Sequence, residues 1–287
     1  VQLDHTSISD RPEFRYRGIR WLIEVEVGVW AYDRGDGPEA YRQRIQEKLD
    51  MALAYKINAV LFDGFGWGTD THPDYADLMR DLNRQARLRG IHLIHGGYGA
   101  GHAGVFRHKS HLYRGQILEN RTSYPDGPVY HCIAGENYCA TCLSNERLME
   151  LRLAELRRFV SAVEPGGLYV HQQDEGLSGA NWSMRCPACR ERWPSDVLAT
   201  ENGMAGAYAF FYDAIVEAVK GVEKPGYNAR RDCLVTFASP GYLGHSVDDE
   251  GWQQGLEYWS TLSRLMKHRD GVYPLFRELF YDHQGNK

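Results

Sequence analysis

The sequence predicts an α/β fold of the (β/α)8 barrel type. Short apolar runs alternate with amphipathic stretches of helical length, which is the pattern of parallel strands joined by helices. The chain has 287 residues, which suits a single barrel, a fold that typically takes about 250 residues. No internal repeat, low-complexity tract or linker divides the sequence. We therefore expect one domain over residues 1–287.

Six apolar runs have the length and composition of strands. In the first, GIRWLIEVEV, large apolar side chains occupy every second position. The second and third, INAVLF and IHLIH, lead into glycine-rich sequence. Pro274 weakens the assignment of the last run, because proline cannot donate a hydrogen bond within a sheet. The expected strands are residues 18–27, 57–62, 91–95, 168–172, 233–238 and 272–280.

The stretches between these runs have helical periodicity. Tyr41, Ile45, Leu49 and Leu53 recur at four-residue spacing and predict one buried face. Gly90 follows the second such stretch and suits the left-handed residue that often ends a helix. The expected helices are residues 38–56, 74–89, 145–163, 205–222 and 252–266.

Two connections are too long for ordinary loops. They are insertions at about residues 96–143 and 176–200, after the third and fourth strands, and such length usually carries function or needs its own cross-link. About six strand–helix units can be counted, whereas a closed barrel of this type has eight. Either the chain is part of a longer protein, or its last strands are poorly marked in the sequence.

Composition excludes several classes of protein. The formal net charge of -5 gives no basic surface for nucleic acid. No apolar run approaches the roughly 18 residues that a membrane helix requires. Residues 1–10 have neither the basic start nor the apolar core of a signal peptide, so the sequence leaves the compartment open. The 7 Trp and 18 Tyr are typical of carbohydrate sites, although most such rings in any protein belong to the core.

An acidic pair follows the fourth expected strand. In residues 168–176, LYVHQQDEG, an apolar strand leads into Asp174 and Glu175. Reacting groups of parallel barrels lie where the strands end. Two neighbouring carboxylates raise the pKa of one of them, so that one carboxyl can stay protonated while the other stays ionised. A glycosidase needs this pairing of acid and carboxylate. The alternative is a helix cap with a solvated charge.

Two further stretches stand beside the acidic pair: residues 10–18, DRPEFRYRG, and residues 90–102, which end in Gly101-His102. Together with the acidic pair they resemble the family 20 glycoside hydrolases, the β-N-acetylhexosaminidases. The first stretch resembles the family's approach to its first barrel strand, and the second resembles its third strand, which ends in a Gly-His pair. The family's fourth strand ends in Gly-Gly-Asp-Glu, and here Gln172 and Gln173 replace the glycines before the intact acidic pair. The resemblance covers roughly the first 175 residues.

The resemblance implies a retaining hydrolase that removes N-acetylhexosamine from an oligosaccharide or glycoconjugate. Catalysis in this family is substrate-assisted: the 2-acetamido oxygen of the substrate attacks the anomeric carbon and gives an oxazolinium ion. Glu175 would be the general acid and base, and Asp174 would orient the acetamido group and stabilise the cation. Arg17 and His102 would bind substrate. Catalysis would need no metal or organic cofactor.

Four further residues are candidates for the substrate pocket. Asp63 and Trp67 follow the second expected strand, Tyr98 follows the third, and Trp182 follows the acidic pair. A flat indole or phenol face can cover the C–H face of a sugar. The alternative for each is a packing role or a tight turn.

Four cysteines form two C-x-x-C pairs, one in each long insertion. Cys139 and Cys142 lie in the first, and Cys186 and Cys189 in the second. Four thiolates at this spacing suit a tetrahedral zinc that links the insertions, with no position left for catalysis. Two disulfides, or thiols in a reducing compartment, are the alternatives.

Two other functions stay open. One is a related barrel glycosidase that cuts internal glycan bonds or acts on a different sugar. The other is a non-catalytic, zinc-stapled module that binds carbohydrate.

Overall fold

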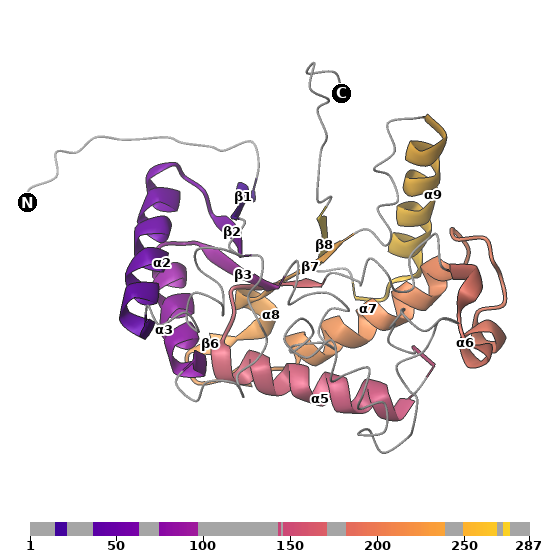
Figure 1. The fold of residues 1–287 in the computed structure, drawn as a ribbon, viewed down its shortest axis with the longest axis horizontal. Coiled ribbons are helices and arrows are strands. Elements are labelled where there is room, and N and C mark those ends of the chain that lie inside the picture. The colour runs from indigo at the N-terminus through magenta and orange to yellow at the C-terminus, as the bar shows by residue number, and fades with distance from the viewer. Residues whose placement is uncertain are drawn as a thin grey trace, which may run out of the picture.

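A parallel sheet covered on one face by helices forms the centre of the molecule (Figure 1). In this computed structural model the described residues are 15–21, 37–62, 75–96, 143–144, 146–170, 182–238, 249–268 and 272–275.

The sheet has six described strands whose spatial order follows the chain order. They are β1 (Gly18–Trp21), β2 (Ala59–Phe62), β3 (His92–Gly96), β4 (Gly167–Val170), β7 (Leu234–Ala238) and β8 (Val272–Leu275). Every neighbouring pair is parallel. A doubly wound fold reverses its strand order part-way, whereas a barrel does not. The α/β class is therefore confirmed, and the sheet has the order of an incomplete barrel.

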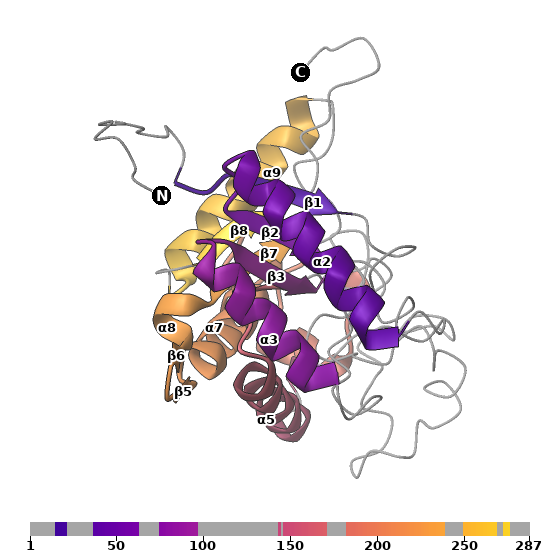
Figure 2. The same ribbon diagram turned by 90° about the vertical axis from the view of Figure 1, so that its left-hand side faces the viewer.

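Five long helices form one continuous layer. They are α2 (Gly37–Ala54), α3 (Tyr75–Leu88), α5 (Glu146–Val163), α7 (Met204–Lys220) and α9 (Asp249–Leu265). Each contacts the next one along the chain. Figure 2 shows α2 and α3 side by side in front of the strands, with α5 below α3. This arrangement agrees with the helices that periodicity predicts. None of the described helices is long and apolar enough to cross a membrane.

The two faces of the sheet belong to separate apolar clusters. Side chains such as Val60, Leu93 and Leu168 join the helices in the main core. The alternate positions of the same strands form a second, smaller cluster of Ala59, Leu61, Ile94 and Tyr169. Since successive strand side chains point to opposite faces, the second cluster lies on the face away from the helices, as the interior residues of a barrel do.

The buried face of α2 differs from the predicted stripe at one position. Tyr41, Ile45 and Leu49 are fully buried, but Leu53 is 51% exposed and Ala52 is buried instead. A helix turns about 100° per residue, so twelve residues after Tyr41 the chain has rotated about 120° away from the starting face. Eleven residues bring Ala52 back to it. Strict four-residue spacing therefore leaves the core after three turns.

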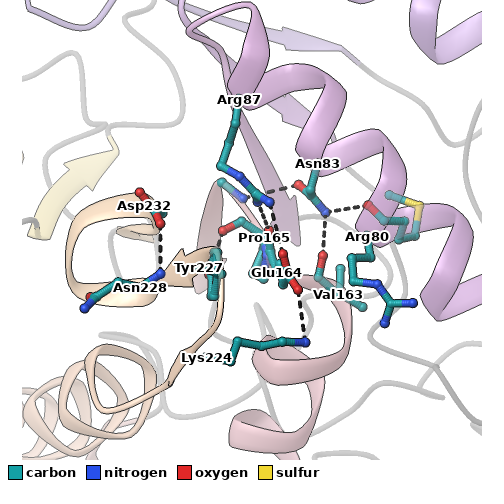
Figure 3. Close-up of polar contacts among 12 residues, drawn as sticks. Arg80, Asn83, Arg87, Val163, Glu164, Pro165, Lys224, Tyr227, Asn228 and Asp232 are labelled. Carbon is teal, nitrogen blue, oxygen red and sulfur yellow. Dashed lines mark hydrogen bonds and ion pairs between the residues drawn. The ribbon is translucent and has the colours of Figure 1, made fainter.

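A polar clamp holds the short link between α5 and β4 (Figure 3). Glu164 has a positive φ of 52°, which is strained for a residue with a side chain. Its carboxylate pairs with Arg87 of α3 and Lys224, each at 3.0 Å, and Arg87 also donates to its carbonyl oxygen at 2.6 Å. Tyr227 donates its hydroxyl to the carbonyl of Pro165 at 2.9 Å. These contacts fix the approach to β4.

Several short elements were not predicted. They are the 3-10 turn η3 (Trp182–Met184), α6 (Pro187–Arg192), the hairpin of β5 (Glu223–Lys224) and β6 (Tyr227–Asn228), and α8 (Ala229–Asp232). Conversely, Pro274 does not prevent β8 from forming. β8 is the last strand of the described sheet, where a missing N–H donor is tolerated.

Candidate active site at the carboxyl end of the sheet

Neighbouring strands end almost level with one another. Phe62 pairs with His95, so β3 continues one residue further than β2. Gly96 pairs with Tyr169, and β4 likewise continues one residue beyond β3. We call this the carboxyl end of the sheet, defined by the last residues of β2, β3, β4 and β7. The opposite end, where these strands begin, is the amino end.

The predicted catalytic pair lies outside the described residues. The strand that precedes it is described: Leu168, Tyr169 and Val170 are all at most 1% exposed. Asp174 follows the last residue of β4 by four positions, and Glu175 by five. The acidic pair therefore follows the carboxyl end of a central, buried strand by only a few residues.

Four of the predicted substrate-binding residues also lie outside the described residues. Asp63 is the residue after the end of β2, and Trp67 follows four positions later. Tyr98 and His102 follow the end of β3 by two and six positions. The strands that lead to these residues and to the acidic pair are direct neighbours that end together. Their placement around one pocket stays a prediction.

Arg17 lies at the other end of the sheet. It immediately precedes β1, and its side-chain Nε donates to the carbonyl oxygen of Lys56 at 2.6 Å. Its backbone N–H donates to Oδ1 of Asn58 at 2.7 Å. Both partners belong to the turn before β2, and β1 and β2 are parallel, so these contacts are at the amino end. They bind the turn to the start of β1, and this position does not support the predicted sugar contact.

Trp182 is part of the packed interior. Its side chain is 1% exposed, and its indole N–H donates to the carbonyl of Ser195 at 2.8 Å. The Arg185 guanidinium lies 4.5 Å from the ring centroid. A sugar platform needs an exposed ring face. The geometry therefore supports a structural role for Trp182.

Arg185 organises the segment around Trp182. Its guanidinium is almost fully buried and donates to the carbonyl oxygens of Trp182, Trp193 and Ser195. It also pairs with Asp196 at 2.6 Å, which lowers the pKa of that carboxyl through the hydrogen bond from the guanidinium. The hydrogen bonds of this one buried arginine thus link Trp182, Trp193 and Ser195 within a short segment.

His95 faces the helices. It is 1% exposed, and its Nε2 lies 3.0 Å from Oδ1 of Asn83 on α3. The same Oδ1 accepts from the backbone N–H of Gly166, and the Asn83 amide nitrogen donates to two carbonyls. The Asn83 oxygen must therefore face His95, so Nε2 carries the proton of a neutral imidazole. His95 is a structural residue, as is commoner for an isolated histidine.

We expect His95 to make stability depend on pH. Burial lowers its pKa from 6.5 to about 3, so between these values the unfolded chain binds a proton that the folded chain does not. Stability therefore falls as pH falls below 6.5, by up to about 1.4 kcal/mol per pH unit from this group. In urea unfolding between pH 6.5 and 5, the free energy of unfolding should fall less steeply with falling pH for His95→Gln than for wild type. The same dependence of stability on pH in both proteins would contradict this account of His95.

The second C-x-x-C pair is described, and the first is not. Cys189 is fully buried and Cys186 is half-buried, and neither is in a disulfide. Ser144 donates its hydroxyl to the sulfur of Cys189 at 3.3 Å across 45 residues of sequence. Cys139 and Cys142 lie outside the described residues. The sequence analysis did not predict the contact of Ser144 with Cys189. The position of this hydroxyl residue, two residues after a C-x-x-C pair, was a signal that could have indicated it.

A cavity of about 360 Å³ lies away from the carboxyl end. It is lined by the last turns of α3, by Glu164 and by the β5–β6 turn at Pro225 and Gly226. Arg87 in its wall is paired with Glu164. In barrels the amino end serves stability, whereas the carboxyl end carries the chemistry. This cavity is therefore not assigned to the active site.

Comparison with known proteins gives limited similarity. No protein-family model and no curated protein sequence matches the chain. Among solved structures it is similar to the chitobiase of Flavobacterium johnsoniae, with a TM-score of 0.46 and 14% identity over 95% of this chain and 46% of that one. It is also similar to the alpha-galactosidase of Lactobacillus brevis, with a TM-score of 0.39 and 9% identity over 85% and 36% of the two chains.

The chain therefore spans less than half the length of either protein. Likeness at this level carries no argument about function, which has to come from the residues themselves.

Proposed function

We propose that this chain is the catalytic barrel of a retaining glycoside hydrolase that removes N-acetylhexosamine. One observation carries the proposal: the acidic pair Asp174 and Glu175 follows the end of β4 by four and five positions, and β4 is a buried central strand of a parallel sheet whose strands end together. The carboxyl ends of such strands are where barrel enzymes place their reacting groups.

Two adjacent carboxyls suit glycoside hydrolysis because one can act as the acid while the other stays ionised. Mutual repulsion raises the pKa of one, which keeps a proton to donate, while the other remains charged. In the proposed arrangement Glu175 holds the proton and Asp174 holds the charge. The acidic pair, together with residues 10–18 and 90–102, resembles the family 20 hydrolases, and that resemblance implies the two roles.

In the first step the acetamido oxygen of the substrate forms a bond to the anomeric carbon. The glycosidic C–O bond breaks, and Glu175 gives its proton to the departing oxygen. Asp174 accepts a hydrogen bond from the acetamido N–H and stabilises the oxazolinium cation. Because the nucleophile belongs to the substrate, the protein mainly has to position it.

In the second step water attacks the anomeric carbon from the side that the leaving group has vacated. Glu175 removes a proton from this water, and the bond to the acetamido oxygen breaks, which regenerates both the acetamido group and the acid. Two inversions give overall retention. The residues that follow β2 and β3, the strands next to β4 on one side, would contact the sugar. They are Asp63, Trp67, Tyr98 and His102.

A panel of substrates tests the proposal. We expect turnover of chromogenic N-acetylglucosaminide or N-acetylgalactosaminide, with the β-anomer of the free sugar as first product by NMR. Turnover of intact glycans alone would favour a glycosidase that cuts internal bonds. Binding of sugar without any turnover would favour a carbohydrate-binding module, and either result would overturn the proposal.

A further inference from the structure

The cavity at the amino end of the sheet has the size of a small-molecule site. Its volume is about 360 Å³, and small-molecule pockets start at roughly 300 Å³. Segments that precede three different strands, β3, β4 and β7, meet around it. The lining residues are Arg84, Arg87, Leu88, Glu164, Pro225 and Gly226. The proposed hydrolysis takes place at the opposite end of the strands, so this cavity is separate from the proposed active site.

Arg87 is held in a fixed position on the cavity wall. One of its terminal nitrogens donates to the carbonyl oxygen of Glu164 at 2.6 Å, and the other donates to the Glu164 carboxylate at 3.0 Å. Its guanidinium also lies 5.2 Å from the ring centroid of Tyr227. A guanidinium has five N–H donors, and within the described part of the chain Arg87 uses two of them. The remaining donors belong to a group that is already ordered, which lowers the entropy cost of binding a ligand.

The charges around the cavity favour an anion. Glu164 alone would repel one, but Arg87 and Lys224 bind its carboxylate from two sides, each at 3.0 Å (Figure 3). Arg84 adds a further cation on α3, and its guanidinium has no hydrogen bond or ion pair to another described residue. Three cations therefore surround one carboxylate, and the excess of positive charge attracts an anionic ligand.

The rest of the cavity wall is apolar. Leu88 is 72% exposed, an unusual position for a leucine unless something packs against it. Pro225 and Gly226 form the two-residue turn between β5 and β6. Gly226 has a φ of 81°, and proline followed by such a residue matches a type II turn, whose backbone is well defined. A ligand with an anionic group and a small carbon body can contact both parts of the wall.

We propose that this cavity binds a small molecule that carries a phosphate or a carboxylate. The anionic oxygens accept hydrogen bonds from Arg84 and Arg87, because guanidinium groups match the geometry of such oxyanions. The carbon body of the ligand packs against Leu88 and Pro225. Binding links α3 to the β5–β6 turn and so stabilises the folded chain. The anion site is independent of the hydrolase proposal, since it uses no residue at the carboxyl end of the sheet.

Calorimetric titration of the whole chain at constant ionic strength tests the site with three probes: inorganic phosphate, glucose 6-phosphate and glucuronate. None of them is a glycoside, so none is a substrate of the proposed hydrolase. We expect saturable binding of at least one probe, with a rise of the thermal midpoint by about 2–4 °C at ten times its Kd. The probe that binds most tightly identifies the ligand as a free oxyanion, a sugar phosphate or an acidic sugar. No binding of any of the three would overturn the proposal.

Two arginine variants locate the binding. Arg84→Gln removes an exposed cation that holds no other described side chain, so the chain should fold normally and bind the probe about 10–100-fold more weakly. Arg158→Gln, at an exposed position of α5 that does not line the cavity, makes the same change of charge and should bind as wild type does. Phosphate also stabilises folded proteins without a specific site, and that effect is the same in both variants. Wild-type affinity and an undiminished rise of the thermal midpoint in Arg84→Gln would show that the cavity is not the binding site.

Discussion

Replacing Glu175 with glutamine should lower kcat about 10²–10⁴-fold on an N-acetylhexosamine disaccharide. Glutamine keeps the size of the side chain and removes the proton that the departing sugar hydroxyl needs. A nitrophenolate leaves without such help, so the first step of a nitrophenyl glycoside should be affected much less. The ratio of the two effects therefore reports on acid catalysis.

Asp174→Asn should give a different pattern. Its proposed role is to orient the acetamido group and stabilise positive charge, and both are needed whatever group departs. We expect comparable losses of kcat/KM on the disaccharide and on the nitrophenyl glycoside. Glu217→Gln, on the exposed face of α7, is the matched control and should leave both rates unchanged. If Glu175→Gln hydrolyses the disaccharide at the wild-type rate, Glu175 is not the general acid.

Replacing Asn83 with alanine should destabilise the fold by about 3–5 kcal/mol. The Asn83 side chain is fully buried and donates to the carbonyl of Val163 (Figure 3). Its oxygen contacts the N–H of Gly166 and the ring of His95. Alanine removes one hydrogen-bond partner from each of these three buried polar groups. A buried group that loses its hydrogen bond costs about 1–3 kcal/mol, and the expected total lies toward the lower end of three such losses.

Urea unfolding followed by circular dichroism measures this loss. Arg84→Ala, an exposed position next to Asn83 on α3, should change stability by no more than about 0.5 kcal/mol. Asn83→Ala should shift the midpoint without changing the denaturant slope, since the same surface is exposed on unfolding. A shift as small as that of Arg84→Ala would show that the amide is not the link between α3 and the start of β4.

The long elements follow from the sequence because their apolar patterns are local. Each predicted helix has a described counterpart, and Gly90 has the positive φ of 68° expected of a residue that ends a helix. Leu156, Phe159 and Val160 of α5 fall on one face of the helix, and all three are buried. In α9, Leu256 is 46% exposed, whereas Tyr258 is buried. In α2, the strict four-residue spacing of the apolar residues does not follow the 3.6-residue turn, and Leu53 is exposed for that reason.

The site residues were harder to predict because their roles depend on which end of the sheet they occupy. Arg17 was assigned from its neighbours in sequence, but it precedes β1 and so lies at the amino end. Trp182 was assigned from its residue type, whereas Arg185 and the carbonyl of Ser195 bury it. Neither partner follows from periodicity. Asn83 carried one usable signal, an amide beside the apolar stripe of α3.

A crystal soak with a thiazoline analogue of the oxazolinium ion tests the central claim most directly. The account predicts that the thiazoline binds beyond the carboxyl ends of β2, β3 and β4, with its ring nitrogen beside the carboxylate of Asp174 and Glu175 within reach of the anomeric carbon. Thiazoline bound elsewhere, or excluded from a chain that still hydrolyses N-acetylhexosaminides, would contradict it.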